Sequence, residues 1–208
     1  IRAVLGARFP EHGIIGEEWD AKASAGEYDW IVDPIDGTRA FISGVPVWGT
    51  LIGLMRGGRA VAGLMAQPFT GETYLGLPGG AWYRRHGETR PIRTSGVIEL
   101  ERAKVTATSP DIFEQAGTTA ELARLRAATL QVRWGLDCYG YCLMAAGHID
   151  LVCESALKNV DIAPLIPIIE NAGGVVTTWD GGPAEAGGNC VAAATPELHE
   201  AALKLLRG

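Results

Sequence analysis

The pattern of secondary-structure signals changes half-way along this chain of 208 residues, and this change constrains the fold more than any other feature. Apolar runs at residues 47–53 and 60–67 flank an Arg-Gly-Gly-Arg turn typical of a β-hairpin. Shorter runs at 73–77 and 81–83 continue an antiparallel meander. Beyond residue 100, helices and strands alternate. A chain with both patterns is expected to form layered sheets with helices between and outside them.

The second half carries the alternating pattern. We predict strands at 103–108, 151–154, 175–179 and 190–194, and helices at 121–128, 138–146, 161–171 and 196–206. The helix at 161–171 is expected to end at a Gly-Gly pair and to bend slightly at Pro167. No repeat or flexible linker divides the chain. We therefore predict a strand-rich half at 1–100 and an α/β half at 101–208, intertwined as one unit with the active site between them.

One predicted strand ends in two carboxylates. Residues 29–33 form an apolar, β-rich run that is expected to stop at Pro34, with a helical turn beginning directly after Asp36. Asp33, Asp36 and the carbonyl of Ile35 would then face one space. Because all three ligands are oxygen atoms, the spacing favours a hard cation, most plausibly Mg²⁺.

The residues that follow are suited to an anion. The N–H groups of Gly37 and Thr38, at the start of a helix, can bind a phosphate. The alternative interpretation is purely structural: Asp33 and Asp36 cap turns, and Gly37 serves a tight bend. This stretch alone does not distinguish the two.

Two more acids add weight to a metal site. Glu17 follows a short strand at 14–15, and Asp161 opens the helix that comes after the strand at 151–154. A simple helix N-cap is the alternative for Asp161. If all four carboxylates converge, they repel one another and raise one another's pKa values, so divalent cations are their natural counter-charge.

Composition excludes several classes of partner. Eighteen Lys and Arg residues against 24 Asp and Glu leave a net charge of −6, which does not favour binding to nucleic acid or an anionic membrane. No apolar run has the roughly 18 to 20 uncharged residues that span a bilayer, and no signal-peptide pattern opens the chain. We expect a cytoplasmic protein without a nucleic-acid or membrane partner.

The four cysteines are expected to be buried free thiols, because none forms a C-x-x-C pair and they are too few for a disulfide scaffold. They are Cys138, Cys142, Cys153 and Cys190. Cys138 and Cys142 share a helical face, but no histidine stands near enough in the sequence to complete a zinc site.

Taken together, these residues resemble the magnesium-dependent inositol monophosphatase superfamily. Residues 30–38 match its W-x-x-D-P-x-D-G-T motif, and residues 159–174 stand where the family has a second acidic motif and a glycine-ended helix. The stretches at 41–44, 108–111 and 135–141 are most similar to the histidinol-phosphatase branch. That branch hydrolyses histidinol phosphate in histidine biosynthesis.

The resemblance implies an α/β fold with layers in the order α-β-α-β-α, as in inositol monophosphatase and fructose-1,6-bisphosphatase-like sugar phosphatases. Because residues 1–8 have the spacing of a helix already under way, the N-terminal helices of that fold are expected to be missing. A further acid that orients the attacking water in the family would lie before Ile1.

The resemblance also implies roles for individual residues. Two or three Mg²⁺ ions would be bound by Glu17, Asp33, the Ile35 carbonyl, Asp36 and Asp161. The substrate would contact Gly37, Thr38, Asp137, Glu154 and Asp161. Glu17 and Thr38 would be the catalytic residues that position the attacking water. Acids at Asp137 and Glu154 suit a cationic amino alcohol better than a neutral polyol.

The implied function is a Mg²⁺-dependent phosphomonoesterase, a homodimer that converts histidinol phosphate to histidinol and phosphate by metal-activated water. An inositol monophosphatase, or another small sugar-phosphate phosphatase of the same fold, is the alternative. A non-catalytic Mg²⁺-binding homologue is the second alternative.

Overall fold

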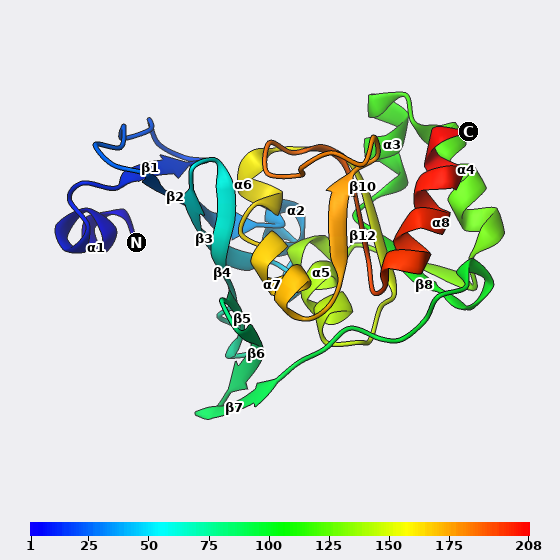
Figure 1. Cartoon of the computed structure of the whole chain (residues 1–208), viewed down its shortest axis with the longest axis horizontal. Coiled ribbons are helices and arrows are strands. Elements are labelled where there is room, and N and C mark those ends of the chain that lie inside the picture. Colours follow the sequence, from blue (N-terminus) through cyan, green and yellow to red (C-terminus); the bar gives the residue numbers. More distant parts are fainter.

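A seven-stranded sheet forms the first layer of the protein, whose computed structural model describes residues 1–208 (Figure 1). Its strands lie in chain order: β1 (Gly13–Gly16), β2 (Tyr28–Asp36), β3 (Gly49–Arg56), β4 (Arg59–Gln67), β5 (Glu72–Leu77), β6 (Gly80–Arg85) and β7 (Glu88–Pro91). Only β1 and β2 are parallel, and every other neighbouring pair is antiparallel. The predicted meander is confirmed, and β7 extends it by one strand that the sequence pattern does not predict.

A five-stranded mixed sheet forms the second β-layer. Its order is β11 (Val175–Thr178), β12 (Gly188–Ala193), β10 (Leu151–Leu157), β8 (Lys104–Ala107) and β9 (Gln131–Trp134). Strands β8, β9 and β10 run parallel, so their carboxyl ends lie at one edge of the sheet. Ligands of open α/β sheets commonly bind outside that edge.

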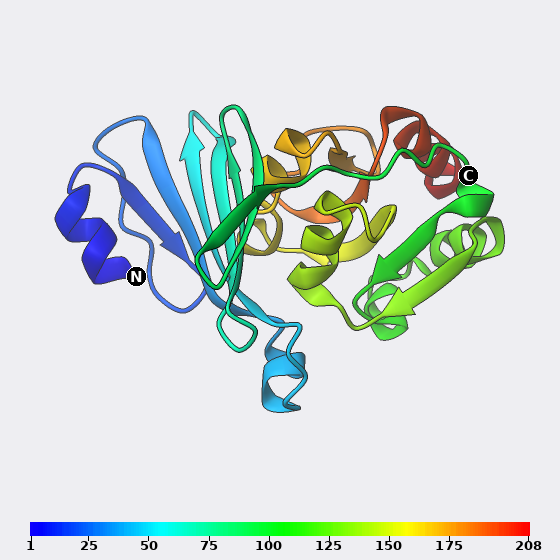
Figure 2. The same ribbon diagram turned by 90° about the horizontal axis from the view of Figure 1, so that it is seen from below.

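Most of the helices fill the space between the sheets or cover the outer face of the second one, whereas the first two along the chain lie outside these layers (Figure 2). The helices are α1 (Arg2–Arg8), α2 (Thr38–Ile42), α3 (Pro110–Ala116), α4 (Thr119–Ala128), α5 (Asp137–Ala145), α6 (Asn159–Ile162), α7 (Ile166–Asn171) and α8 (Pro196–Arg207), with a 3₁₀ turn at Leu100–Arg102. A core of 22 buried residues joins α5 and α7 to both sheets. Another 15 buried residues pack α3, α4 and α8 on the outer face. The expected layered α/β fold is confirmed.

A row of glycines brings the first sheet close to the helical layer. Gly53, Gly63 and Gly76 lie directly opposite one another on β3, β4 and β5. A methyl group on Gly63 would overlap the carbonyl oxygen of Pro164, and one on Gly76 would overlap the backbone at Ile168. The segment between α6 and α7 therefore packs directly on the sheet backbone, which fixes the position of α6.

The prediction that β2 stops at Pro34 is wrong, because β2 continues to Asp36. The pairing with β3 passes from Asp33 opposite Leu51 to Asp36 opposite Gly49, so β2 has one extra residue there. Such a bulge tolerates proline, whose missing N–H is not needed in the ladder.

The single helix predicted at 161–171 is divided in the structure. Helix α6 ends at Ile162 and α7 begins at Ile166, in place of one helix with a slight bend at Pro167. Two prolines three residues apart remove two N–H donors, which breaks the helix at Pro164. Pro167 then lies in the first turn of α7, where no donor is needed. Asp161 consequently lies in a short helix of its own.

Two expectations from composition can be compared with the structure. All four cysteines are free and buried, as predicted. None of the helices combines the length and the apolar character that crossing a bilayer requires.

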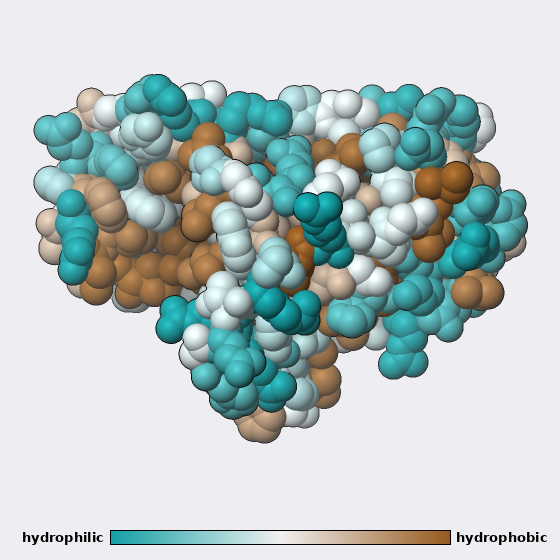
Figure 3. Space-filling model, turned by 60° about the horizontal axis from the view of Figure 1, so that its bottom comes forward, coloured by the Kyte–Doolittle hydropathy of each residue, from teal (hydrophilic) through white to brown (hydrophobic).

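Hydrophobic side chains also gather on the surface, at the end of the molecule that holds α1 (Figure 3). A hollow of about 560 Å³ at this end is lined by Ile1, Ile14, Trp19 and Val32 among others. On the side that packs on α7, by contrast, Leu51, Met65 and Tyr74 of the first sheet are buried.

Candidate active site

A cavity of about 170 Å³ lies where residues of β2, α2, α5, α6 and β10 meet. Every site residue expected from the sequence lines it: Glu17, Asp33, Ile35, Asp36, Gly37, Thr38, Asp137, Glu154 and Asp161. The other lining residues are Thr108, Ile112, Cys138, Tyr141 and Leu157. The fold thus brings the candidate residues from both halves of the sequence to one place.

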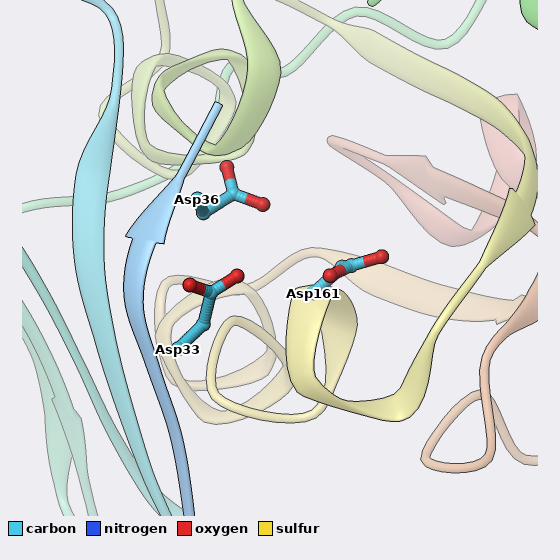
Figure 4. Close-up of side chains that lie close together, drawn as sticks. All are labelled: Asp33, Asp36 and Asp161. Carbon is cyan, nitrogen blue, oxygen red and sulfur yellow. The ribbon is translucent and has the colours of Figure 1, made fainter. Parts of the chain in front are cut away.

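Three carboxylates form a tight cluster at this cavity (Figure 4). Asp33 and Asp36 come from β2, and Asp161 faces them from α6. One oxygen atom of each lies within 4.8 Å of the others. Atoms this close can share a metal ion or repel one another strongly.

Backbone N–H groups hold the carboxylates of the cluster in place. Each accepts one such hydrogen bond: Asp33 from Ile35 (2.9 Å), Asp36 from Cys138 (3.0 Å) and Asp161 from Lys158 (2.8 Å). Asp161 is the third residue of α6, and its side chain accepts from the backbone N–H of the N-cap residue, Lys158, so Asp161 is not the N-cap itself. Each carboxylate keeps further oxygen lone pairs for a ligand.

Burial and mutual repulsion make the negative charges of this cluster unfavourable unless a cation is bound. Burial raises the pKa of Asp33 to about 8, with further contributions from the charges of Asp36 and Glu17. Burial raises the pKa of Asp36 to about 7, and the charge of Asp161 adds to this effect. A divalent cation would remove this penalty. Because the donors are carboxylate oxygens with the Ile35 carbonyl nearby, the residues present fit Mg²⁺.

Glu17 is a fourth carboxylate that lines the cavity together with Asp33, Asp36 and Asp161. It directly follows β1, and its Oε1 atom lies 2.7 Å from Nζ of Lys158. Their side chains are 28% and 66% exposed, so this ion pair stabilises the fold little. The sequence pattern does not predict Lys158 as a site residue, because a lysine before a helix is typical of a solvated surface.

Gly37 and Thr38 join the end of β2 to α2, and both line the cavity. Gly37 has a φ of 79°, and a Cβ there would lie 3.1 Å from Oδ2 of Asp137 and 3.2 Å from Cα of Trp48. Both the backbone conformation and the available space therefore require glycine. The Thr38 hydroxyl donates to the Ile35 carbonyl at 3.2 Å.

Asp137 and Glu154 form a second acidic group in the same cavity. Burial raises the pKa of Asp137, which begins α5 with a φ of 45°. Glu154 is 2% exposed, and its Oε2 atom has no hydrogen-bond partner. Burial raises the pKa of Glu154 to about 8, although hydrogen bonds from Thr108 oppose this shift. A cationic ligand beside these acids would compensate for their burial.

Comparison with known proteins agrees with this geometry. Residues 1–208 match the family model described as "Inositol monophosphatase family". The chain belongs to the inositol monophosphatase family. An inositol monophosphatase from Zymomonas mobilis has a solved structure that superposes with a TM-score of 0.90 at 37% identity, covering 100% of this chain and 79% of that one.

Curated relatives of this family member carry several names. The chloroplastic bifunctional phosphatase IMPL2 of Arabidopsis thaliana is 38% identical over 98% of this chain and 61% of its own length. The histidinol-phosphatase of Chlorobaculum parvum is 35% identical over 87% of this chain and 69% of its own. The expected resemblance to the histidinol-phosphatase branch is confirmed. The chain spans less than two thirds of the Arabidopsis relative.

Two hydroxyl-bearing residues are among the lining residues of this phosphatase-family cavity that the sequence does not predict as site residues. They are Thr108, which binds Glu154, and Tyr141, whose buried hydroxyl has no hydrogen-bond partner. Both lie in stretches that carry the resemblance to the histidinol-phosphatase branch. The residues of those stretches indicate the histidinol-phosphatase branch. That the Thr108 and Tyr141 side chains line the cavity, however, depends on the packing of α5 against β8 and β10.

The bulge that follows Glu154 stores backbone strain, and we predict that Ala156→Gly stabilises the protein. Ala156 has a φ of 58°, where a Cβ costs about 1–2 kcal/mol and glycine costs little. After the greater freedom of glycine in the unfolded chain is subtracted, about 0.5–1 kcal/mol remains. Thermal unfolding should show a Tm about 1–4 °C higher. Ala62→Gly, in β4 with a negative φ, should instead lower the Tm.

Proposed function

We propose that this chain is a Mg²⁺-dependent phosphomonoesterase that hydrolyses histidinol phosphate to histidinol and phosphate. The observation that carries the proposal is the presence of two acidic groups in one cavity. The cluster of Asp33, Asp36 and Asp161 suits a metal, whereas Asp137 and Glu154 suit a cationic leaving group. Relatives named histidinol-phosphatase support the same assignment.

The metal would be bound by the carboxylate and carbonyl oxygens that line one side of the cavity. We propose two or three Mg²⁺ ions bound by Glu17, Asp33, the Ile35 carbonyl, Asp36 and Asp161. When bound, Mg²⁺ supplies positive charge that makes a water more acidic and stabilises negative charge on the phosphoryl and leaving-group oxygens.

The protein groups would orient the reactants. The Thr38 hydroxyl and the Glu17 carboxylate are proposed to hold the attacking water, and the Gly37 and Thr38 amides to hold the phosphate. An in-line displacement by water then needs no covalent phosphoenzyme. An aspartyl nucleophile is not favoured, because the motif Asp33-Pro34-Ile35-Asp36 lacks the Asp-x-Asp spacing of that chemistry.

Specificity would come from the second acidic group. Histidinol carries an ammonium group and an imidazole ring, whereas inositol is a neutral polyol. Because Glu154 is buried and one of its oxygens is unpaired, an N–H donor with positive charge gains more there than a hydroxyl does.

Asp137→Asn tests this assignment, because asparagine tolerates the positive φ that alanine does not. We expect kcat/KM for histidinol phosphate to fall at least tenfold, roughly the loss of one charge-assisted hydrogen bond. The value for inositol monophosphate should change much less. Equal losses on both substrates would remove the specificity role of Asp137.

The direct test of the function is Mg²⁺-dependent phosphate release from histidinol phosphate and from inositol monophosphate, measured side by side with EDTA controls. A strong preference for histidinol phosphate is expected. A preference for inositol monophosphate would keep the metal assignment and overturn the substrate.

The alternative function, inositol monophosphatase or another small sugar-phosphate phosphatase, is favoured by the similarity to the Zymomonas mobilis enzyme. Binding of Mg²⁺ without release of phosphate would instead indicate a non-catalytic homologue. With the lead function we propose a cytoplasmic homodimer acting in histidine biosynthesis, whose halves at 1–100 and 101–208 work as one unit.

A further inference from the structure

Thr108 and Glu154 lie side by side at the carboxyl edge of the second sheet. Strands β8 and β10 are parallel neighbours, with Thr106 opposite Val152. Two residues further along the chain, this register places Thr108, directly after the end of β8, beside Glu154 of β10, and both line the cavity. Their contact is thus set by strand pairing and not by a flexible loop.

Both donors of Thr108 bind the same carboxylate oxygen. Its N–H lies 2.6 Å and its hydroxyl 2.9 Å from Oε1 of Glu154. Oε2 of Glu154 is buried and has no hydrogen-bond partner. An unpaired buried carboxylate oxygen is costly, so Oε2 is the atom available to a donor that enters the cavity.

The two contacts also fix the direction of the carboxyl plane. With the backbone N–H alone, the Glu154 side chain could rotate about its last bond and exchange its two oxygens. The Thr108 hydroxyl adds a second hydrogen bond to the same oxygen. Because rotation would have to break both hydrogen bonds, the second one restricts it. The Thr108 hydroxyl also lies near Asp137, and it has one proton to share between the two acids.

We infer that Thr108 is a positioning residue for specificity: it binds Oε1 of Glu154 so that Oε2 receives an N–H of a cationic leaving group. This inference rests on the proposed function, since it assigns the role of one residue in recognising the same substrate. In this role Thr108 acts through Glu154 and not on the reacting phosphate. Its effect should therefore appear in binding of the leaving group and in KM more than in kcat.

The test compares Thr108→Val, Thr108→Ser and the matched control Thr106→Val. Thr106 lies two residues before Thr108 and is buried, whereas Thr108 is half-buried; the Thr106 hydroxyl donates to the carbonyl of Arg133, and Thr106 does not line the cavity. Histidinol binding is measured by calorimetry without turnover. KM and kcat are measured with histidinol phosphate and with glycerol 2-phosphate, whose leaving group is neutral.

Thr108→Val is expected to weaken histidinol binding, and to raise KM for histidinol phosphate, by about tenfold, with a much smaller effect on kcat and on glycerol 2-phosphate. Thr108→Ser should restore both values, and Thr106→Val should leave them little changed. If Thr108→Val does not fold, the comparison of Thr108→Ser with Thr108→Ala replaces it.

Equal losses on both substrates, no rescue by Thr108→Ser, or the same loss in Thr106→Val would overturn the inference. If the wild type hydrolyses histidinol phosphate in those cases, the proposed function stands and only the role of Thr108 fails. If the wild type releases no phosphate from histidinol phosphate, the proposed function fails. Histidinol binding then tests the inference about Thr108. Histidinol binding that Thr108→Val weakens supports the inference, and either no histidinol binding or binding that Thr108→Val does not weaken overturns it.

Discussion

Asp33→Asn is expected to abolish Mg²⁺-dependent phosphate release while the protein remains folded. The substitution removes a full charge from the centre of the carboxylate cluster but keeps the side-chain volume and the contact with the Ile35 N–H. Loss of a residue that merely supports a metal ligand costs about 10–100-fold in affinity or activity, so loss of a ligand should cost more than about 100-fold.

The stability of the same variant provides an independent readout. The pKa of Asp33 is raised to about 8 from 3.8, so its proton is held more tightly in the folded state. Its contribution to stability is present below pH 3.8 and is lost as pH rises through about 8. At pH 8–9 without metal, Asp33→Asn should therefore unfold at a higher temperature than the wild type. Added Mg²⁺ should raise the wild-type Tm and not that of the variant.

Asp29→Asn is the matched control, because Asp29 lies on the same strand and does not line the cavity. It should keep both turnover and the Mg²⁺-dependent rise in Tm. Phosphate release is followed with histidinol phosphate over a range of Mg²⁺ concentrations. Wild-type activity in Asp33→Asn would contradict the metal assignment.

Gly63→Ala should have the largest effect on the fold itself. The added methyl group would overlap the Pro164 carbonyl, which is backbone and cannot rotate away. Overpacking of this kind costs about 3 kcal/mol, or a fall in Tm of about 6–12 °C. Because Pro164 follows α6, the shift should also move Asp161 away from Asp33 and reduce Mg²⁺ affinity.

The measurements are thermal unfolding and Mg²⁺ binding by calorimetry, with Gly26→Ala as the control. Gly26 has open space around its Cα and no positive φ, so its substitution should be nearly neutral. A Gly63→Ala protein with wild-type Tm would show that the sheet and α6 are not held by this contact.

Sequence patterns predicted the elements whose signals are local. The turn at 56–59 and the meander around it are confirmed, because glycines in a tight turn and alternating strands act within a few residues. The short strands β7 and β9 and helix α3 were not predicted. Strand β7 is fully exposed and has no apolar pattern, whereas β9 alternates polar and apolar residues but over only 4 residues, which is too short a run to mark a strand.

The errors at Pro34 and at 161–171 have a related cause. Proline was expected to end β2, but a bulge against β3 accommodates it. One helix was expected where Pro164 and Pro167 divide the chain into α6 and α7. At Pro34 the backbone conformation depends on pairing with β3, and between α6 and α7 it depends on packing against the first sheet. Patterns of neighbouring residues carry no information about such contacts.

Residue types and their order along the chain define the chemical groups available to this protein: the carboxylates it carries, Asp33 and Asp36 on either side of a proline, and the glycine after them. These are properties of residue type and of neighbours along the chain. Folding, in contrast, brings Asp161 close to those aspartates and places both donors of Thr108 at one oxygen of Glu154. Such contacts depend on strand register and on the close packing of α6 against the sheet, and these arise from interactions between residues far apart in the chain.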